Sequence, residues 1–379
     1  MNNNKQLTIC FFGTYDNTYT SNKMVLQGLK DNGVKVIEVN AHTKVTRLDK
    51  KDEMNWLNLL SRVFSKVKII QEIFRHWSDI KQSDAIYVGY PGHVDVFPAF
   101  IVAKILRKKL VFNPLLIIYI GFAEEQGILN KKSIMGWVIK KAESLVYRMC
   151  DLVFADTPFQ EQFLRHDFQV PKHKLKVLPI GADDRFYSYT PYENSSKKIN
   201  CCYYGLYSPV HGVEYIIDAA RILKNNKNIT FSMIGNGNTF EKNYQLAKKL
   251  GLSNMTFYHD VPESEHPKIM ARSDLFFGFL AHTPTVDRVI PNKVYQGMAQ
   301  NKLVVTADAP VTRSVFKNGH NMVLVNPADG KSLAEAIVEL SENPKKRIRM
   351  ITESYNLFKT KFTPKAVGAQ LKKDVLSIL

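Results

Sequence analysis

The chain has 379 residues, of which 45% are hydrophobic and 23% charged. That length is too great for one ordinary hydrophobic core and suits two domains, and the composition is that of a globular soluble protein. Neither a low-complexity tract nor an internal repeat is present, which excludes fibrous and solenoid architectures. Lys and Arg number 52 against 35 Asp and Glu, so the net charge is +17. Because the basic excess is spread over both halves, it favours polyanionic partners: nucleotide phosphates, nucleic acid or an anionic membrane surface.

The first residues and the cysteines indicate a cytoplasmic protein. Residues 1–9 pass directly into an apolar strand and lack the long apolar core of a signal peptide. The longest apolar run, around 115–122, is too short and too interrupted to span a bilayer. The cysteines have no C-x-x-C spacing, so we expect reduced thiols and a cytoplasmic location. They are Cys10, Cys150, Cys201 and Cys202.

The first half of the chain alternates apolar strands with helical patterns. A helix is predicted at 23–32, with Met24, Leu26 and Leu29 on its buried side and Gly33 at its end. Strand–helix–strand alternation predicts an α/β domain with a parallel, doubly wound sheet. The predicted strands are 7–12, 34–39, 85–88, 110–112 and 152–155.

A polar stretch rich in Ser and Lys, 187–198, separates the first half from a second alternating set and is predicted to be a linker. We therefore expect a first domain over 1–186, a second over 199–355 and a final helical segment over 356–379. In open parallel sheets, ligands bind beyond the carboxyl ends of the strands, so two such domains would face a shared cleft. The second set comprises strands at 201–204, 229–234, 255–258, 275–279 and 303–306, with helices at 213–223, 243–250 and 267–271 and another that begins near Asn292.

The segment 288–306 has the pattern of an anion site. A polar loop leads into a helix N-terminus, where the first N–H groups have no intrahelical partner and the helix dipole is positive. Arg288 and Lys293 would supply full charges for a diphosphate, and Gln296 lies one turn into the helix, within reach of a ribose. An ordinary loop with solvated basic residues is the alternative, and the motif alone does not distinguish the two.

Glycine turns follow two other strands of the second half. The turn after 201–204 opens a helix, so its backbone and the helix N–H groups could approach a phosphate. His211 lies in this turn, where a structural role and a phosphate contact fit equally well. The glycines concerned are Gly205, Gly212, Gly235 and Gly237.

The segment Asp287 to Gln296 resembles the donor-binding motif of the retaining family 4 glycosyltransferases, in a sub-group that carries Asp-Arg-Val-Ile-Pro-Asn-Lys. The resemblance implies the GT-B fold, with two Rossmann-like domains and a C-terminal helix that packs back on the first. It implies transfer of a sugar, with retention, from a nucleotide diphosphate sugar to a lipid-linked or saccharide acceptor in cell-surface polysaccharide or glycolipid synthesis. We expect no metal, because a D-x-D motif with a supporting acidic cluster is missing.

The resemblance also assigns roles to residues. His93 follows the strand 85–88 and would approach the transferring sugar, where an imidazole that titrates near neutral pH can donate or accept a hydrogen bond; a loop or helix-capping histidine is the alternative. The catalytic residues would be His93, Arg288 and Lys293. Donor-binding residues would be Gly205, His211, Gly212, Gly235, Gly237, His259, Asp287, Asn292 and Gln296, and acceptor-side residues Gly13, Tyr15 and Glu125.

Three positions depart from the sub-group pattern: Ile120 replaces an Asp, Gln126 an Arg and Gln296 a Glu. An amide can still bond ribose hydroxyls, whereas isoleucine cannot replace a carboxylate in any hydrogen bond. These departures leave a second function open, that of a non-catalytic partner subunit that supports an active glycosyltransferase. A third, nucleic-acid binding, rests on net charge alone, since helix-turn-helix, RNP and zinc-finger signatures are missing.

Two basic amphipathic segments, 56–74 and 131–150, could contact anionic lipid headgroups. Each could equally be a helix that covers the sheet and has a solvated basic face. The expected location is therefore cytoplasmic, with peripheral contact on the cytosolic face of a membrane as a further prediction.

Overall fold

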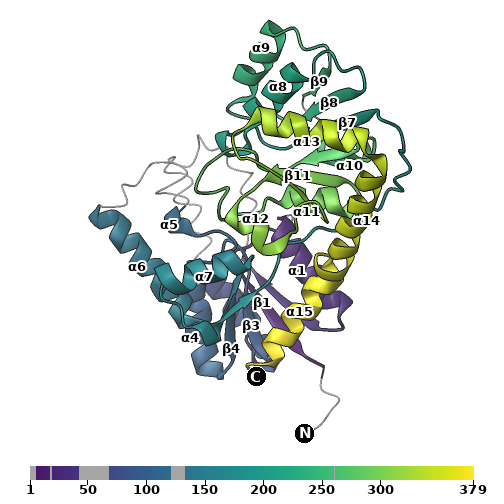
Figure 1. The fold of residues 1–379 in the computed structure, drawn as a ribbon. Coiled ribbons are helices and arrows are strands. Elements are labelled where there is room, and N and C mark those ends of the chain that lie inside the picture. Colours follow the sequence, from purple (N-terminus) through teal and green to yellow (C-terminus); the bar gives the residue numbers. More distant parts are fainter. Residues whose placement is uncertain (1–5, 18, 42–67, 121–132, 260) are drawn as a thin grey trace. The chain divides into compact units, whose positions relative to one another are not determined.

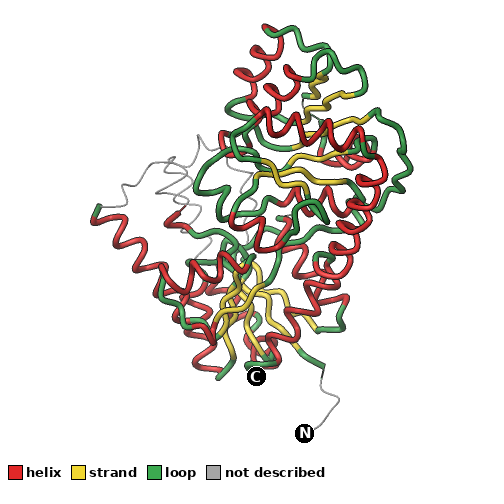
Figure 2. Tube along the Cα trace, viewed as in Figure 1, coloured by secondary structure: helices red, strands yellow, loops and turns green. Residues whose placement is uncertain are grey.

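The computed structural model describes residues 6–17, 19–41, 68–120, 133–259 and 261–379 (Figure 1). They form two compact units. The first unit comprises Met1–Asp156, Gln160–Pro179 and Pro364–Leu379, and the second comprises Thr157–Phe159 and Ile180–Thr363. Each unit has one parallel sheet with helices on both faces, which confirms the predicted α/β, Rossmann-like domains (Figure 2).

The sheet of the first unit has the strand order β2-β1-β3-β4-β5-β6, and every neighbouring pair is parallel. The chain order reverses between β1 and β3, so the carboxyl ends of these two strands flank the crevice where such sheets bind ligands. The strands are β1 (Thr8–Gly13), β2 (Lys35–Asn40), β3 (Ala85–Val88), β4 (Lys109–Phe112), β5 (Leu152–Ala155) and β6 (Leu175–Val177). The helices are α1 (Thr20–Asp31), one at 68–75, α3 (Trp77–Gln82), α4 (Val96–Leu106), α5 (Ile118–Ile120), α6 (Ile134–Met149), α7 (Pro158–Asp167) and α15 (Pro364–Leu376).

The two faces of this sheet bury separate cores. One core packs β1 and β3 against α4, α6 and the helix at 68–75, whereas the other packs the opposite face against α1 and α15. The close packing of α1 on α15 depends on glycine, because a Cβ on Gly28 would lie 2.9 Å from the Cα of Gly368. The C-terminal helix therefore belongs to the first unit, although it follows the second in sequence.

The sheet of the second unit has the order β12-β11-β10-β7-β8-β9, again all parallel, with the reversal between β7 and β10. Its strands are β7 (Ile199–Tyr204), β8 (Ile229–Ile234), β9 (Met255–Tyr258), β10 (Leu275–Phe277), β11 (Leu303–Ala307) and β12 (Val323–Val325). Its helices are α8 (Val213–Ile222), α9 (Phe240–Lys249), α10 (His266–Ala271), α11 (Asn292–Ala299), α12 (Pro310–Val315), α13 (Gly330–Glu342) and α14 (Pro344–Lys361).

The stretch 187–198, predicted to be a linker, is fixed to the second unit. The Asp274 carboxylate accepts hydrogen bonds from the Tyr192 hydroxyl at 2.8 Å and the Asn194 amide at 2.7 Å. The fully buried Arg347 donates to the carbonyl oxygens of Asn194 and Ser196. These charge-assisted bonds hold the polar segment in place, so 187–198 lies within the second unit, whose long segment runs from Ile180 to Thr363.

Every predicted strand is present, with ends within two residues of the prediction, whereas the three-residue strands β6 and β12 were not predicted. The basic segment 131–150 contains α6, which begins after Ser133 because its side chain accepts a hydrogen bond from the Gly136 N–H at 3.0 Å. Of the other basic segment, 56–67 lies outside the described residues. No helix in the described part of the chain is long and apolar enough to cross a membrane.

Candidate functional site

Three predicted donor-site residues meet at the switch point of the second unit. β7 ends at Tyr204, and Gly205 begins a turn that leads through a short 3-10 helix, Pro209–His211, to α8. Lys293 is the second residue of α11, and the Nζ atom of Lys293 lies 3.1 Å from Nδ1 of His211. Residues 82 positions apart in the sequence are thus brought together beside β7 and the N-terminus of α11.

Lys293 is a buried cation without a counter-ion. Lys293 is only 5% exposed, and its Nζ atom lies 4.2 Å from the centroid of the Tyr203 ring. No carboxylate among the described residues lies within ion-pairing distance of Nζ. Burial lowers the pKa of Lys293 from 10.5 to about 7, with a small opposing effect from Cys202. An uncompensated buried charge is costly and is relieved by an anion, so this is the environment expected of an anion-binding lysine.

His211 is held as a neutral imidazole. Burial, and secondarily the charge of Lys293, lowers the pKa of His211 to about 2. Nδ1 lies 2.6 Å from the Tyr203 hydroxyl and 3.1 Å from Nζ of Lys293. A protonated lysine can only donate, so Nδ1 must accept and the ring proton is assigned to Nε2. Among the described residues Nε2 has no hydrogen-bond partner, which leaves this N–H for a ligand.

Gly205 makes room for the lysine. Its φ angle is +140°, and a Cβ placed on it would lie 2.9 Å from Nζ of Lys293. A larger residue would therefore both strain the backbone and displace the ammonium group. The other predicted glycines lie in adjoining turns. Gly212 immediately precedes α8. Gly235 and Gly237 lie in the turn after β8, where Gly235 packs against the carbonyl oxygen of Gly205.

The remaining donor-site predictions lie on the loop before α11 and on α11 itself. Asp287 and Arg288 are half-buried in this loop, where the Arg288 N–H donates to the Thr285 carbonyl at 3.0 Å. Asn292 is the first residue of α11. Gln296, one turn later, is 6% exposed and its amide has no hydrogen-bond partner among the described residues. An amide without a partner, on the same helix as Lys293, remains available to a ligand hydroxyl.

His259 lies apart from this cluster. It follows the edge strand β9, two strands away from β7, and its side chain is exposed. Its ring packs edge-on against Phe240, with centroids 4.4 Å apart, and against Tyr244 at 5.5 Å. The structure thus places His259 on an aromatic surface and not beside Lys293.

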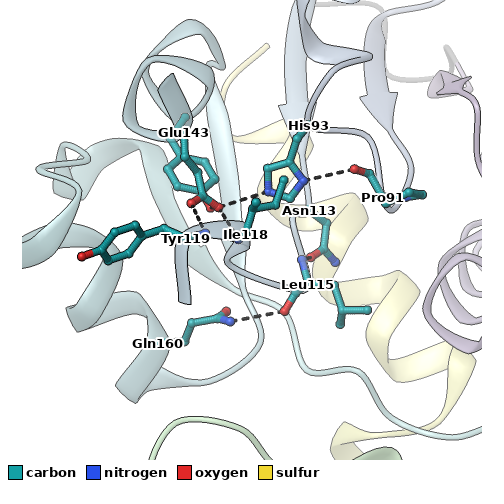
Figure 3. A network of polar contacts seen from close by, with 9 residues as sticks. Pro91, His93, Asn113, Leu115, Ile118, Tyr119, Glu143 and Gln160 are labelled. Atoms are coloured by element: carbon teal, nitrogen blue, oxygen red, sulfur yellow. Dashed lines mark hydrogen bonds and ion pairs between the residues drawn. The ribbon is translucent and has the colours of Figure 1, made fainter. Parts of the chain in front are cut away.

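In the first unit, His93 lies in a buried polar network (Figure 3). Nδ1 is 3.1 Å from the Pro91 carbonyl oxygen, and Nε2 is 3.3 Å from the Glu143 carboxylate. Nε2 makes no hydrogen bond among the described residues, although it lies this close to the carboxylate. His93 is 5% exposed and both ring nitrogens lie beside protein groups, and its role toward the transferring sugar stays a prediction.

Glu143 is the member of this network that sequence reasoning missed. Its carboxylate accepts hydrogen bonds from the N–H groups of Ile118 at 2.7 Å and Tyr119 at 2.9 Å, and from the Tyr147 hydroxyl at 2.6 Å. Burial, and then the Glu143 charge, raises the pKa of Tyr147 well above its usual value. The helical spacing of the sequence could have indicated that Glu143 is buried, because it lies on the same apolar side of α6 as Val146 and Tyr147.

The acceptor-side predictions are only partly described. Gly13 ends β1 next to Asp95, whose carboxylate accepts from the N–H of Thr14 at 2.7 Å and from its hydroxyl at 2.8 Å. Tyr15 is fully buried in the core with its hydroxyl 3.3 Å from the Glu38 carboxylate, and its role toward an acceptor stays a prediction. Ile120 is also a core residue. Glu125 and Gln126 lie outside the described residues.

Within the described ranges, no three His, Cys, Asp or Glu side chains gather closely enough to hold a metal ion. The four cysteines are all described, buried and unpaired.

One family model matches most of the second unit. Residues 191–357, which include the whole Lys293 cluster, match the family model described as glycosyl transferases group 1. The matched residues contain β7 to β12 and the helices between them. A search of curated proteins finds no match.

Solved structures resemble the chain over nearly its whole length. The crystal structure of Anabaena Alr3699/HepE in complex with UDP is 16% identical, with a TM-score of 0.66 over 98% of this chain and 100% of that one. Sucrose-phosphate synthase from Thermosynechococcus elongatus is 13% identical with a TM-score of 0.68, and a glycosyltransferase from Rickettsia africae is 14% identical with 0.66, each over 99% of both chains. With two parallel six-stranded sheets, the chain has the GT-B fold, as predicted.

Proposed function

We propose that this chain is a glycosyltransferase that moves a sugar from a nucleotide diphosphate sugar to a lipid-linked or saccharide acceptor. The observation that carries the proposal is Lys293, a buried ammonium group with no carboxylate partner in the described part of the chain, at the switch point of a parallel sheet. The family match over 191–357 supports the reaction class. Further support comes from the Anabaena protein, whose crystal structures include complexes with UDP and UDP-glucose.

The cluster around Lys293 suits a diphosphate. Lys293 would place one positive charge on it, the first N–H groups of α11 would donate hydrogen bonds, and Gly205 leaves the space for close approach. The Nε2–H of His211 would donate a further bond as a neutral group. Arg288, on the loop before α11, would supply the second charge. Together these groups would stabilise the negative charge that develops on the departing diphosphate, which is the catalytic effect of a preorganised electrostatic site.

The finer assignments follow from the sequence motif. We propose a family 4 enzyme of the Asp-Arg-Val-Ile-Pro-Asn-Lys sub-group that acts with retention and without a metal, and in which Gln296 bonds the donor ribose. The acceptor side would lie on the first unit, near the end of β1. We also propose that the enzyme works in cell-surface polysaccharide or glycolipid synthesis, in the cytoplasm or at the cytosolic face of a membrane.

The test is a thermal-shift screen of the purified chain against UDP, GDP, TDP, ADP and CMP, with and without EDTA. A ligand that binds only the folded state raises the free energy of unfolding, by about 2.7 kcal/mol when its concentration is a hundred times its Kd. The melting temperature rises as a result. The proposal predicts a rise with one nucleoside diphosphate that EDTA does not change. The same rise in a Lys293→Met variant would show that the nucleotide binds elsewhere, and a rise that EDTA abolishes would contradict the metal-free mechanism.

A second candidate function is a non-catalytic partner subunit, and the replaced residues favour it. Ile120 is a core residue with 7% exposure, so it has no polar role, and Gln296 lacks the charge of the family's glutamate. A Gln296→Glu variant tests this candidate, because it restores a charge-assisted bond to ribose hydroxyls. Transfer activity in the wild type, or activity gained in the variant, would exclude it. Absence of both, together with no nucleotide binding, would support it.

A further inference from the structure

Exposed apolar side chains are concentrated on two helices of the first unit. Among the described residues, eight of the twenty large hydrophobic side chains that are exposed lie on α4 and α6. On α4 they are spaced at intervals of four residues and form one stripe, and on α6 they lie along one side. These residues are Phe97, Ile101 and Ile105 on α4 and Ile134, Met135, Trp137, Val138 and Leu145 on α6.

The two stripes belong to one surface. α4 and α6 contact each other, and both bury their inner sides against the same core and the same face of the sheet (Figure 1). Their outer sides therefore point away from that sheet face together. The exposure is extensive: Ile134 is 84% exposed, Trp137 61% and Ile105 63%. Scattered apolar residues on a surface need no explanation, but eight exposed on two helices that contact each other mark an interaction site.

The exposed charges that α4 and α6 contribute to this surface, which we call the α4–α6 face, are basic, and one of them, Lys140, lies 3.5 Å from the Asp167 carboxylate of α7. The two helices and the turn after α4 carry exposed or half-buried charged side chains, and all of these are basic. The acidic Glu143 of α6 is buried and faces the core. Lys141 lies over the Trp137 ring, with Nζ 5.9 Å from the centroid. The basic residues are Lys104, Arg107, Lys108, Lys140, Lys141 and Arg148.

We propose that the α4–α6 face is the site at which this protein docks on an anionic lipid bilayer. A bilayer matches both properties of the face, since aliphatic and indole side chains enter the interface while Lys and Arg contact anionic headgroups. A second copy of the chain fits poorly, because a predominantly basic face would meet another of the same sign. Aromatic and aliphatic residues mixed with lysine on one side of a helix are typical of interfacial binding.

This inference extends the proposed function, because a lipid-linked acceptor lies in such a surface. It can be tested separately, because vesicle binding needs neither donor nor acceptor. Failure of vesicle binding would leave nucleotide binding intact, and failure of nucleotide binding would leave vesicle binding intact.

The experiment is flotation of the full chain with phosphatidylcholine vesicles that contain, or lack, about one third phosphatidylglycerol. We expect binding to the anionic vesicles only, weakened by salt. The double substitution Ile134→Ser with Trp137→Ser should reduce the partition coefficient at least about tenfold, through loss of buried apolar area. Lys141→Ala should reduce it about fivefold, the effect of one basic residue.

The matched control is Leu376→Ser, which removes an exposed apolar side chain from α15, on the opposite face of the same sheet. It should bind as the wild type does, and melting temperatures of all variants establish that they are folded. Absence of binding to anionic vesicles would overturn the proposal, as would binding that the double substitution leaves unchanged. A dimer in analytical ultracentrifugation that the double substitution dissociates would also overturn it, because the face would then join two copies.

Discussion

Replacement of Lys293 by methionine should stabilise the ligand-free protein while it removes nucleotide binding. Methionine has nearly the volume of lysine without the charge. Burial lowers the pKa of Lys293 from 10.5 to about 7, and each pKa unit corresponds to about 1.4 kcal/mol, so the buried charge costs at most about 5 kcal/mol. We expect a gain of about 2 kcal/mol, because the variant also loses the contact between Nζ and His211.

The pH dependence of this gain has a definite sign. Between pH 7 and 10.5 the unfolded chain holds a proton on Lys293 that the folded chain has released, so wild-type stability rises with pH across this window. Below pH 7 both states are protonated and the cost is fully present. The difference between variant and wild type should therefore be largest below pH 7 and disappear towards pH 10.5.

Urea denaturation of both proteins at several pH values measures this difference. A Lys302→Met variant is the matched control, because Lys302 is also buried but its ammonium group donates to the Ala271 carbonyl at 2.7 Å. Loss of that bond leaves a buried acceptor unpaired, which should offset the gain from charge removal. If Lys293→Met stabilises the protein at pH 6 no more than Lys302→Met does, Lys293 is a structural residue and the reasoning is refuted.

The remaining predictions concern the Lys293 cluster of the second unit and the Glu143 network of the first. Gly205→Ala should weaken nucleotide binding by at least about tenfold in calorimetry, since its Cβ would lie 2.9 Å from Nζ of Lys293; unchanged affinity would mean that the lysine is free to move. Nucleotide affinity of the wild type should fall as pH rises above about 7, because the anion binds the protonated lysine, and a flat profile would argue against Lys293 as the charge that binds. Glu143→Ala should cost about 3 kcal/mol in urea denaturation, because the Ile118 and Tyr119 N–H groups lose their acceptor, whereas Glu143→Gln should cost less; equal losses would show that the carbonyl-type acceptor is irrelevant.

Most of the fold could be predicted from the sequence because parallel strands leave a local signal. Each strand that was predicted is a short apolar run between polar turns, and both sheets bury both faces, so the runs are continuous and easy to detect. Lys293, His211 and Gly205 were predicted separately, as a catalytic charge and as donor-binding residues, for a related reason. All three lie near strand ends or helix starts, where the topology of such a sheet brings residues together.

The sequence is least informative where long-range contacts override local composition. The polar stretch 187–198 has the composition of a linker, but Asp274 and Arg347, about 80 and 150 residues later, fix it by hydrogen bonds. The buried state of Tyr15 and His93 likewise depends on packing that no local pattern records. Glu143 was overlooked because one carboxylate in a basic helix carries no motif, although its helical spacing placed it on the apolar side.

The most direct test of the central claim, that Lys293 and its neighbours hold the diphosphate of a sugar donor, is calorimetric titration of the wild type and of Lys293→Met with UDP, GDP, TDP and ADP near pH 7. The account predicts saturable binding of one of these by the wild type and a loss of at least about tenfold, or about 1.4 kcal/mol, in the variant. Equal affinity of both proteins for the same nucleotide would contradict it.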